Sequence, residues 1–180
     1  MIPISDINPA ENTPYITRFF IFFTIAVYIL LQPKNSTDLF NFFYEFSAIP
    51  CEIQKGVPLS ANQFYSNDCM VTIDNVIFAN KNLMLSLITA NFLHANLLHL
   101  VGNLWSFWIF GNNIEDKLGN LKFIIFLMVA AGGSIGTHIF LNYSDLNPIV
   151  GASGIVSALM GAYLYSCLLY TSPSPRDSDS

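Results

Sequence analysis

Three polar side chains lie within apolar stretches of this chain, at positions where they could carry out acyl transfer. Ser153 lies in the Gly-Ala-Ser-Gly motif of residues 151–154, at the head of an apolar run. His99 and Asn103 are four residues apart, so a helix would place both on one face. If Ser153 opens a helix, unpaired N–H groups and the positive end of the helix dipole converge beside its hydroxyl. Donors gathered beside a nucleophilic hydroxyl suit an acyl-transfer transition state, because negative charge develops on the carbonyl oxygen.

The same serine-containing segment also has a purely structural interpretation. Serine is common where membrane helices touch, and Gly154, Ala158 and Ala162 recur every four residues as a small-residue packing face. In the catalytic interpretation, Gly151 and Gly154 instead let a substrate backbone approach without a Cβ in the way. Ser153 alone does not decide between these interpretations, so the catalytic one depends on His99 and Asn103.

The composition predicts a membrane protein that crosses the bilayer several times. Of 180 residues, 53% are hydrophobic and 11% are charged, whereas soluble domains carry about 25% charged residues. The net charge is −5 and the seven Lys and Arg form no basic patch, so no nucleic-acid partner is expected. Cys51, Cys69 and Cys167 lack Cys-x-x-Cys or Cys/His spacing, so we expect no metal site. No cofactor is indicated.

The apolar runs predict four spanning segments and one long loop. The expected spans cover about residues 16–31, 83–110, 121–141 and 151–170. If Asn96 caps the helix of the second span, that helix runs to Phe110, and a polar turn follows over residues 111–120. Short-loop basic residues favour a cytoplasmic N-terminal tail over residues 1–15. The loop of residues 32–82 then faces outward, and Ser153, His94 and His99 share the outer half of the membrane.

The expected outer loop contains an amphipathic aromatic segment over residues 39–49, preceded by the cap-like Ser36-Thr37-Asp38. It could lie in the membrane interface or form a buried helix of a small loop domain. Cys51 and Cys69 could pair if the loop faces an oxidising compartment. The tail of residues 171–180 breaks sharply from the apolar run and is expected to be disordered or non-native.

Three motifs in order resemble the rhomboid family of intramembrane serine proteases, in its bacterial type. They are FLHANLLHLVGN, then Gly111-x-x-x-Glu115-x-x-x-Gly119, then GASG followed by SALMGAY, and the likeness covers about residues 88–165. The resemblance implies an all-α membrane protein with a rhomboid-like helical bundle around an outward-facing, water-filled cavity. Four of the six expected core transmembrane helices are present in this chain.

The resemblance also implies a role for each matching residue. Ser153 would be the nucleophile, and His99 and Asn103 the oxyanion donors. His94 matches a supporting histidine near the cavity mouth. The remaining matches are the glycines beside the nucleophile and the structural residues: Gly151 and Gly154, the turn motif of Gly111, Glu115 and Gly119, and the helix-packing Gly161.

The function that the resemblance implies is endoproteolysis of transmembrane segments of other membrane proteins. The family's general base is a histidine on its sixth helix, so we expect it to lie outside this chain and the 180-residue fragment to be inactive. His138 is expected to pack between helices instead. The alternative is a non-catalytic rhomboid-like protein that binds membrane clients. The resemblance places the protein in a bacterial plasma membrane and leaves its oligomeric state open.

Overall fold

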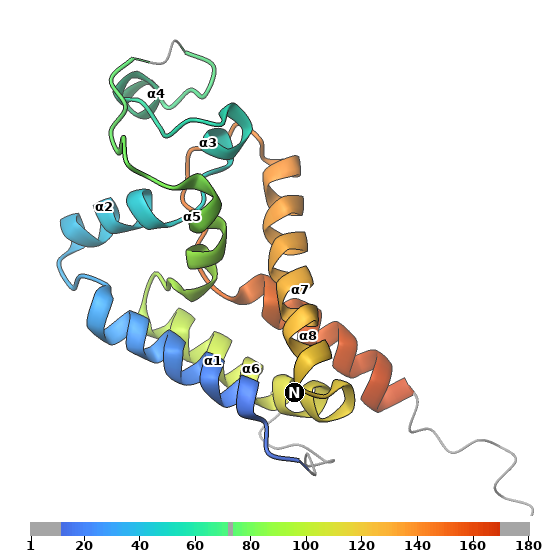
Figure 1. Cartoon of the computed structure of the whole chain (residues 1–180). Helices are drawn as coiled ribbons and strands as arrows, with labels where there is room; N and C mark the ends of the chain where they lie inside the picture. The colour runs from blue at the N-terminus through green and yellow to red at the C-terminus, as the bar shows by residue number, and fades with distance from the viewer. Residues whose placement is uncertain (1–11, 72–73, 170–180) are drawn as a thin grey trace, which may run out of the picture.

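The computed structural model describes residues 12–71 and 74–169, and their regular elements are helices joined by loops (Figure 1). Within them, extended pairing is limited to two isolated bridges, so the chain is an all-α protein. The expected tail of residues 171–180 lies outside the described residues, as do residues 1–11 of the tail expected over residues 1–15. The elements are α1 Tyr15–Ala26, the π-helical η1 Val27–Leu31, α2 Ser36–Phe46, α3 Pro50–Lys55, α4 Ala61–Ser66, α5 Leu83–Thr89, the 3₁₀ turn η2 Ala90–Phe92, α6 Leu97–Leu118, α7 Asn120–Leu141, α8 Ser153–Tyr163 and the π-helical η3 Leu164–Leu169.

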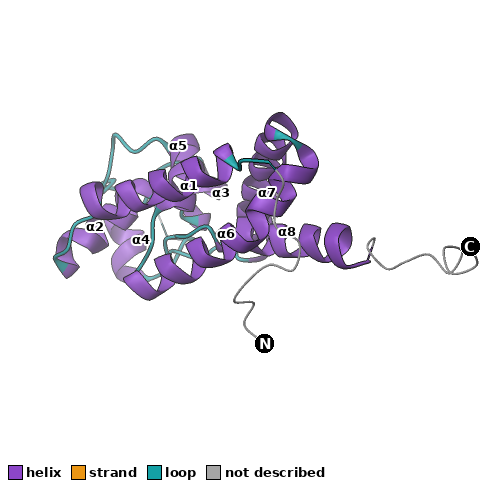
Figure 2. Ribbon diagram, turned by 90° about the horizontal axis from the view of Figure 1, so that it is seen from below, coloured by secondary structure: helices purple, strands orange, loops and turns teal. Residues whose placement is uncertain are grey.

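The main core lies where α1, α6, α7 and α8 meet. Phe107, Phe123 and Leu159 are completely buried there, each on a different helix. The rings of Phe20 and Phe107 stack with centroids 4.2 Å apart, which joins α1 to α6. Figures 1 and 2 show these two helices side by side, with α8 running away beyond them. The packed helices thus bring the two halves of the predicted site, on α6 and α8, to one core.

Only part of the helical structure is long enough to cross a bilayer. Among the described residues, α7 alone is long and apolar enough, with a mean hydropathy of 1.9 over its best window. The pair α5–η2 and α6 would be a second span if taken together, but it bends by 82°. The helix of residues 15–31 is apolar and shorter. The second span expected over residues 83–110 is therefore broken, because Asn96 starts α6 afresh by accepting a hydrogen bond from the His99 amide at 2.9 Å.

The polar turn predicted over residues 111–120 is wrong, because α6 continues as a helix through Leu118. Only Gly119 turns the chain, with φ +73°, a value that favours glycine. The Glu115 carboxylate is 2% exposed and accepts hydrogen bonds from the backbone amides of Ile16 and Thr17, both at 2.8 Å. Those amides open α1 and have no partner within that helix. Glu115 therefore caps a helix about a hundred residues earlier in the chain.

Gly111 explains how α1 comes close enough for this cap. A Cβ on Gly111 would lie 3.2 Å from Thr17 Oγ1 and 3.3 Å from the Phe107 ring. The three residues of the predicted motif thus take part in helix contact, capping and a turn.

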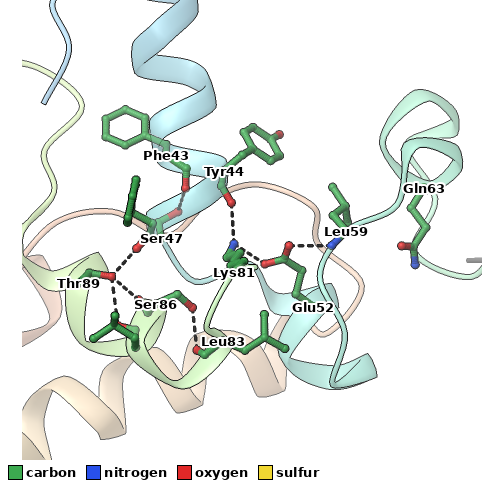
Figure 3. A network of polar contacts seen from close by, with 12 residues as sticks. Phe43, Tyr44, Ser47, Glu52, Leu59, Gln63, Lys81, Leu83, Ser86 and Thr89 are labelled. Atoms are coloured by element: carbon green, nitrogen blue, oxygen red, sulfur yellow. Dashed lines mark hydrogen bonds and ion pairs between the residues drawn. The ribbon is translucent and has the colours of Figure 1, made fainter. Parts of the chain in front are cut away.

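The loop of residues 32–82 has a small core of its own. Cys51 and Cys69 form a disulfide, with Cα atoms 5.8 Å apart. Glu52 and Lys81 form a buried ion pair, and Lys81 also donates to the Tyr44 carbonyl at 2.7 Å (Figure 3). Burial raises the pKa of Glu52 and lowers that of Lys81, while the charge of each opposes the shift of the other.

The amphipathic segment forms α2, whose cap is Asn35 instead of the expected Ser36. Asn35 Oδ1 accepts from the Thr37 amide at 3.0 Å. None of the α2 residues is buried, so its interpretation as a buried helix of a loop domain is wrong. Its placement in the membrane interface stays a prediction.

The loop core also holds the connection that leads to Ser153. The Cys51 amide donates to the Asp145 carbonyl at 3.0 Å, and the Ile149 amide donates to the Ala48 carbonyl at 2.8 Å. Leu146 packs into the cluster around the disulfide. The segment before α8 is therefore fixed from the loop side, and Figure 1 shows α3 close to the end of α7 from which this segment starts.

Candidate active site

His99 and Asn103 on α6 lie against the backbone that enters α8. A Cβ on Gly151 would be 2.7 Å from His99 Cε1, 2.8 Å from His99 Nε2 and 3.4 Å from Asn103 Nδ2. Gly151 has φ +108° and its amide donates to the Ala90 carbonyl at 2.9 Å. The two predicted oxyanion donors and the motif containing Ser153 are thus brought together. Within the described residues, the His99 ring nitrogens have no hydrogen-bond partner, which leaves them available to a ligand.

Asn103 is oriented by His94. Asn103 Nδ2 lies 3.0 Å from His94 Nε2, and because an amide nitrogen can only donate, Nε2 accepts. The ring proton is therefore on Nδ1, which donates to the Phe92 carbonyl at 3.2 Å. His94 is fully buried and lies behind Asn103, and its predicted place near a cavity mouth stays a prediction. This bond uses one of the two Nδ2 hydrogens and leaves the other for a ligand.

Ser153 is the first residue of α8 and its side chain is exposed. The residue before it, Ala152, makes no side-chain cap, so the first N–H groups of α8 have no capping side chain within the described residues. Uncapped N–H groups and the positive helix end favour negative charge at this point. Ser153 thus lies on the first turn of α8, where these backbone N–H groups are found.

The glycines beside Ser153 make room for the protein's own side chains. Gly151 faces His99, and a Cβ on Gly154 would lie 2.2 Å from Ser134 Oγ and 2.4 Å from Ser134 Cβ. Gly154 thus allows α7 to touch α8. The expectation that both glycines leave space for a substrate backbone is corrected, because side chains of the protein itself occupy the space beside each glycine.

Two predicted residues are not brought into the site. Nothing lies within 4 Å of a Cβ built on Gly161 among the described residues, so its packing role stays a prediction. His138 is exposed near the end of α7, so the expectation that it packs between helices is wrong, and its carbonyl accepts from Asn142. In the part of the chain that the structure describes, no group of three or more His, Cys, Asp or Glu could hold a metal ion.

Sequence reasoning missed two residues next to the site, Gln32 and Ser134. Gln32 ends an apolar run and contacts His94, 62 positions later. Ser134 looks like one more small residue in an apolar helix. Neither has a local signal, because the importance of each comes from a distant partner.

Comparisons with known proteins match the part of the chain that carries these residues. A family profile described as "Rhomboid domain" matches residues 81–173. RHOMBOID-like protein 1 of Arabidopsis thaliana is 30% identical over 148 residues, which are 81% of this chain and 36% of that protein. RHOMBOID-like protein 6, mitochondrial, also of Arabidopsis thaliana, is 43% identical over 83 residues, 46% of this chain and 26% of that protein. The putative rhomboid protease YdcA of Bacillus subtilis is 40% identical over 88 residues, 46% of this chain and 41% of that protein.

The aligned regions span less than half the length of each of these relatives. No solved structure matches the chain.

Proposed function

Because this chain belongs to the rhomboid family, we propose that Ser153, His99 and Asn103 form the acyl-transfer centre of an intramembrane serine endopeptidase. Membership makes it an integral membrane protein of a family that includes proteases. The observation that carries the proposal is the contact of His99 and Asn103 with Gly151, two residues before Ser153. The substrates would be transmembrane segments of other proteins, reached from within the lipid bilayer.

In the proposed reaction, Ser153 Oγ attacks the scissile carbonyl carbon and gives its proton to a general base. The carbonyl oxygen becomes negative and accepts hydrogen bonds from the His99 ring, from the second Nδ2 hydrogen of Asn103 and from the Ser153 amide. The C–N bond then breaks, the base returns the proton to the leaving amine, and the acyl group stays on Ser153. Water, deprotonated by the same base, releases the acyl group in the second half of the cycle.

The general base is proposed to be a histidine outside this chain. His94 uses its Nε2 lone pair on Asn103, and His99 is placed as an oxyanion donor. A serine without its base loses roughly 10⁴-fold or more in rate. The proposal is therefore tested in the complete gene product.

A fluorophosphonate probe tests the nucleophile. The complete gene product in membranes should be labelled, and Ser153→Ala should abolish the labelling, whereas Ser157→Ala, one turn later on α8, should not. Equal labelling of the Ser153→Ala variant would refute the proposal. Absence of labelling in the unaltered protein, together with capture of membrane clients, would instead support the non-catalytic alternative.

We also propose that the N-terminus is cytoplasmic and that the disulfide loop faces outward across a bacterial plasma membrane. The Cys51–Cys69 disulfide supports this orientation, because such bonds persist in oxidising compartments. In intact cells carrying Cys167→Ala, an impermeant phosphine reductant followed by an impermeant maleimide should label Cys51 and Cys69. Labelling only after lysis would mean that the loop faces the cytoplasm. It would leave the proposed reaction unaffected.

A further inference from the structure

We propose that Gln32 is a positioning residue for the oxyanion site, acting through His94 on Asn103. This inference rests on the proposed function and adds a residue to it. Gln32 directly follows η1, at the opposite end of the first helical segment from Glu115, and is 4% exposed. Gln32 itself takes no part in the proposed reaction.

The Gln32 amide pairs with both backbone groups of one residue. Gln32 Nε2 donates to the His94 carbonyl at 2.9 Å, and the His94 amide donates to Gln32 Oε1, also at 2.9 Å. Two hydrogen bonds between a planar amide and a single residue fix the position and the orientation of that residue's backbone. This geometry would be lost with either a shorter or an apolar side chain.

His94 needs such support because it lies outside the helices. It sits between η2 and α6, in the stretch where the chain bends by 82°, so no helix supplies partners for its amide and carbonyl. Without Gln32, both groups would be buried and unpaired. Each unpaired group costs about 1–3 kcal/mol, so residue 94 would move toward other partners.

A movement of His94 passes directly to Asn103. The His94 ring supplies the acceptor that holds Asn103 Nδ2 at 3.0 Å, and its own orientation is set by the bond to Phe92. Displacement of a reacting group by about 1 Å can lower a rate by about 10²-fold. The structure therefore links the end of η1 to the proposed oxyanion donor through two consecutive contacts, Gln32 to His94 and His94 to Asn103.

A double-mutant cycle in the complete gene product tests this link. The variants are Gln32→Met, which keeps the side-chain length without its amide, Asn103→Ala, and the pair. Cleavage of a transmembrane peptide in detergent micelles gives kcat and KM separately. We expect Gln32→Met alone to lower kcat about tenfold or more with KM nearly unchanged. In the Asn103→Ala background, the same change should lower kcat less than about twofold, because its target is gone.

Thr24→Val is the matched control. Thr24 is buried on α1 and donates to the Phe20 carbonyl at 2.8 Å, so the variant loses a buried hydrogen bond of the first helix without touching His94. It should lower the melting temperature. Its effect on kcat should be small and of the same size in both backgrounds. If Gln32→Met does not fold, Gln32→Glu replaces it in the cycle, because it keeps an acceptor for the His94 amide.

The cycle separates this inference from the proposed function. Equal kcat losses from the Gln32 variant in both backgrounds would show that Gln32 only stabilises the fold, and the inference would be wrong. Cleavage that survives Ser153→Ala would overturn the proposed function instead. If Ser153→Ala is inactive but the Gln32 and Asn103 variants show no coupling in kcat, the proposed function stands. Only the positioning role of Gln32 is then rejected.

Discussion

Asn103 Nδ2 donates to His94 Nε2 over 3.0 Å, and the histidine is completely buried while the amide faces the entry to α8. One buried acceptor thus decides which hydrogen of the Asn103 amide is left for a ligand. The proposed oxyanion role of Asn103 predicts that Asn103→Ala lowers kcat about 10²- to 10³-fold. Steady-state cleavage kinetics of the complete gene product check this.

Asn113→Ala is the control for that change. Asn113 is also buried on α6 and donates to the Ile109 carbonyl at 3.0 Å, away from the site. We expect it to lower stability and to leave kcat of the folded protein within about twofold of the parent. Comparable kcat losses in the two variants would assign Asn103 a structural role.

The contact of Gly154 with Ser134 predicts that Gly154→Ala loosens α7 from α8. The new Cβ would meet Ser134 Oγ at 2.2 Å, and overpacking of this kind costs about 1–3 kcal/mol. Ser134→Gly removes the opposing atoms and should restore most of the stability in the double variant. Thermal unfolding in detergent micelles measures both effects.

Gly161→Ala, on the same helix, should raise the stability that Gly154→Ala lowers. Open space surrounds that position among the described residues, so the variant should gain up to about 1 kcal/mol from helix propensity. A loss of stability would show that Gly161 packs against something outside the described residues, as the family resemblance implies.

The cap that Glu115 provides predicts a graded loss of stability. Glu115→Ala leaves the amides of Ile16 and Thr17 without their buried acceptor and should cost about 2 kcal/mol in the free energy of unfolding. Glu115→Gln keeps one acceptor oxygen and should lose less. Equal losses in the two variants, measured by denaturant titration, would mean that the charge of Glu115 matters more than its hydrogen bonds.

The buried Glu52–Lys81 pair predicts a pH-dependent loss when one partner is removed. Lys81→Met leaves an unpaired buried carboxylate and should destabilise the protein by about 3–5 kcal/mol near pH 7. Burial already raises the pKa of Glu52, and removing Lys81 takes away the charge that opposes this rise. The folded state then binds the proton more tightly than the unfolded state, so stability rises as pH falls toward the unfolded pKa.

The double variant Glu52→Gln, Lys81→Met is the control for the pH effect. It carries no buried charge at these positions, so its stability should be close to that of the parent and should not rise in the same way at low pH. Thermal melts between pH 8 and pH 5 make the comparison. A Lys81→Met variant whose melting temperature is insensitive to pH would contradict the assignment of a buried Glu52.

Local patterns predicted the features whose partners are local. The apolar run of residues 121–141 corresponds to α7 within one residue, and Asn96 caps α6 because its acceptor is three residues from His99. The continuation of α6 past Gly111 was not predictable in this way. Charges at residues 115–117 are typical of a turn, and only the start of α1, far away in the sequence, explains the buried Glu115.

The candidate site shows the same division between features with local partners and features with distant ones. His99 and Asn103 share a helix face, and that spacing was enough to place them together. The pairing of Asn103 with His94 depends on the bend at residues 93–96, and the clamp from Gln32 depends on a contact across 62 residues. Periodicity carries no information on either, because both arise from how helices meet.

The Glu115 cap also sets an order on biosynthesis. The backbone amides of residues 16 and 17 emerge from the ribosome about a hundred residues before the carboxylate that satisfies them. Until residue 115 has been made and placed beside them, the first helix begins with two donors that have no intrahelical acceptor. The start of α1 is thus completed by a residue made much later, and its final packing waits for the end of α6.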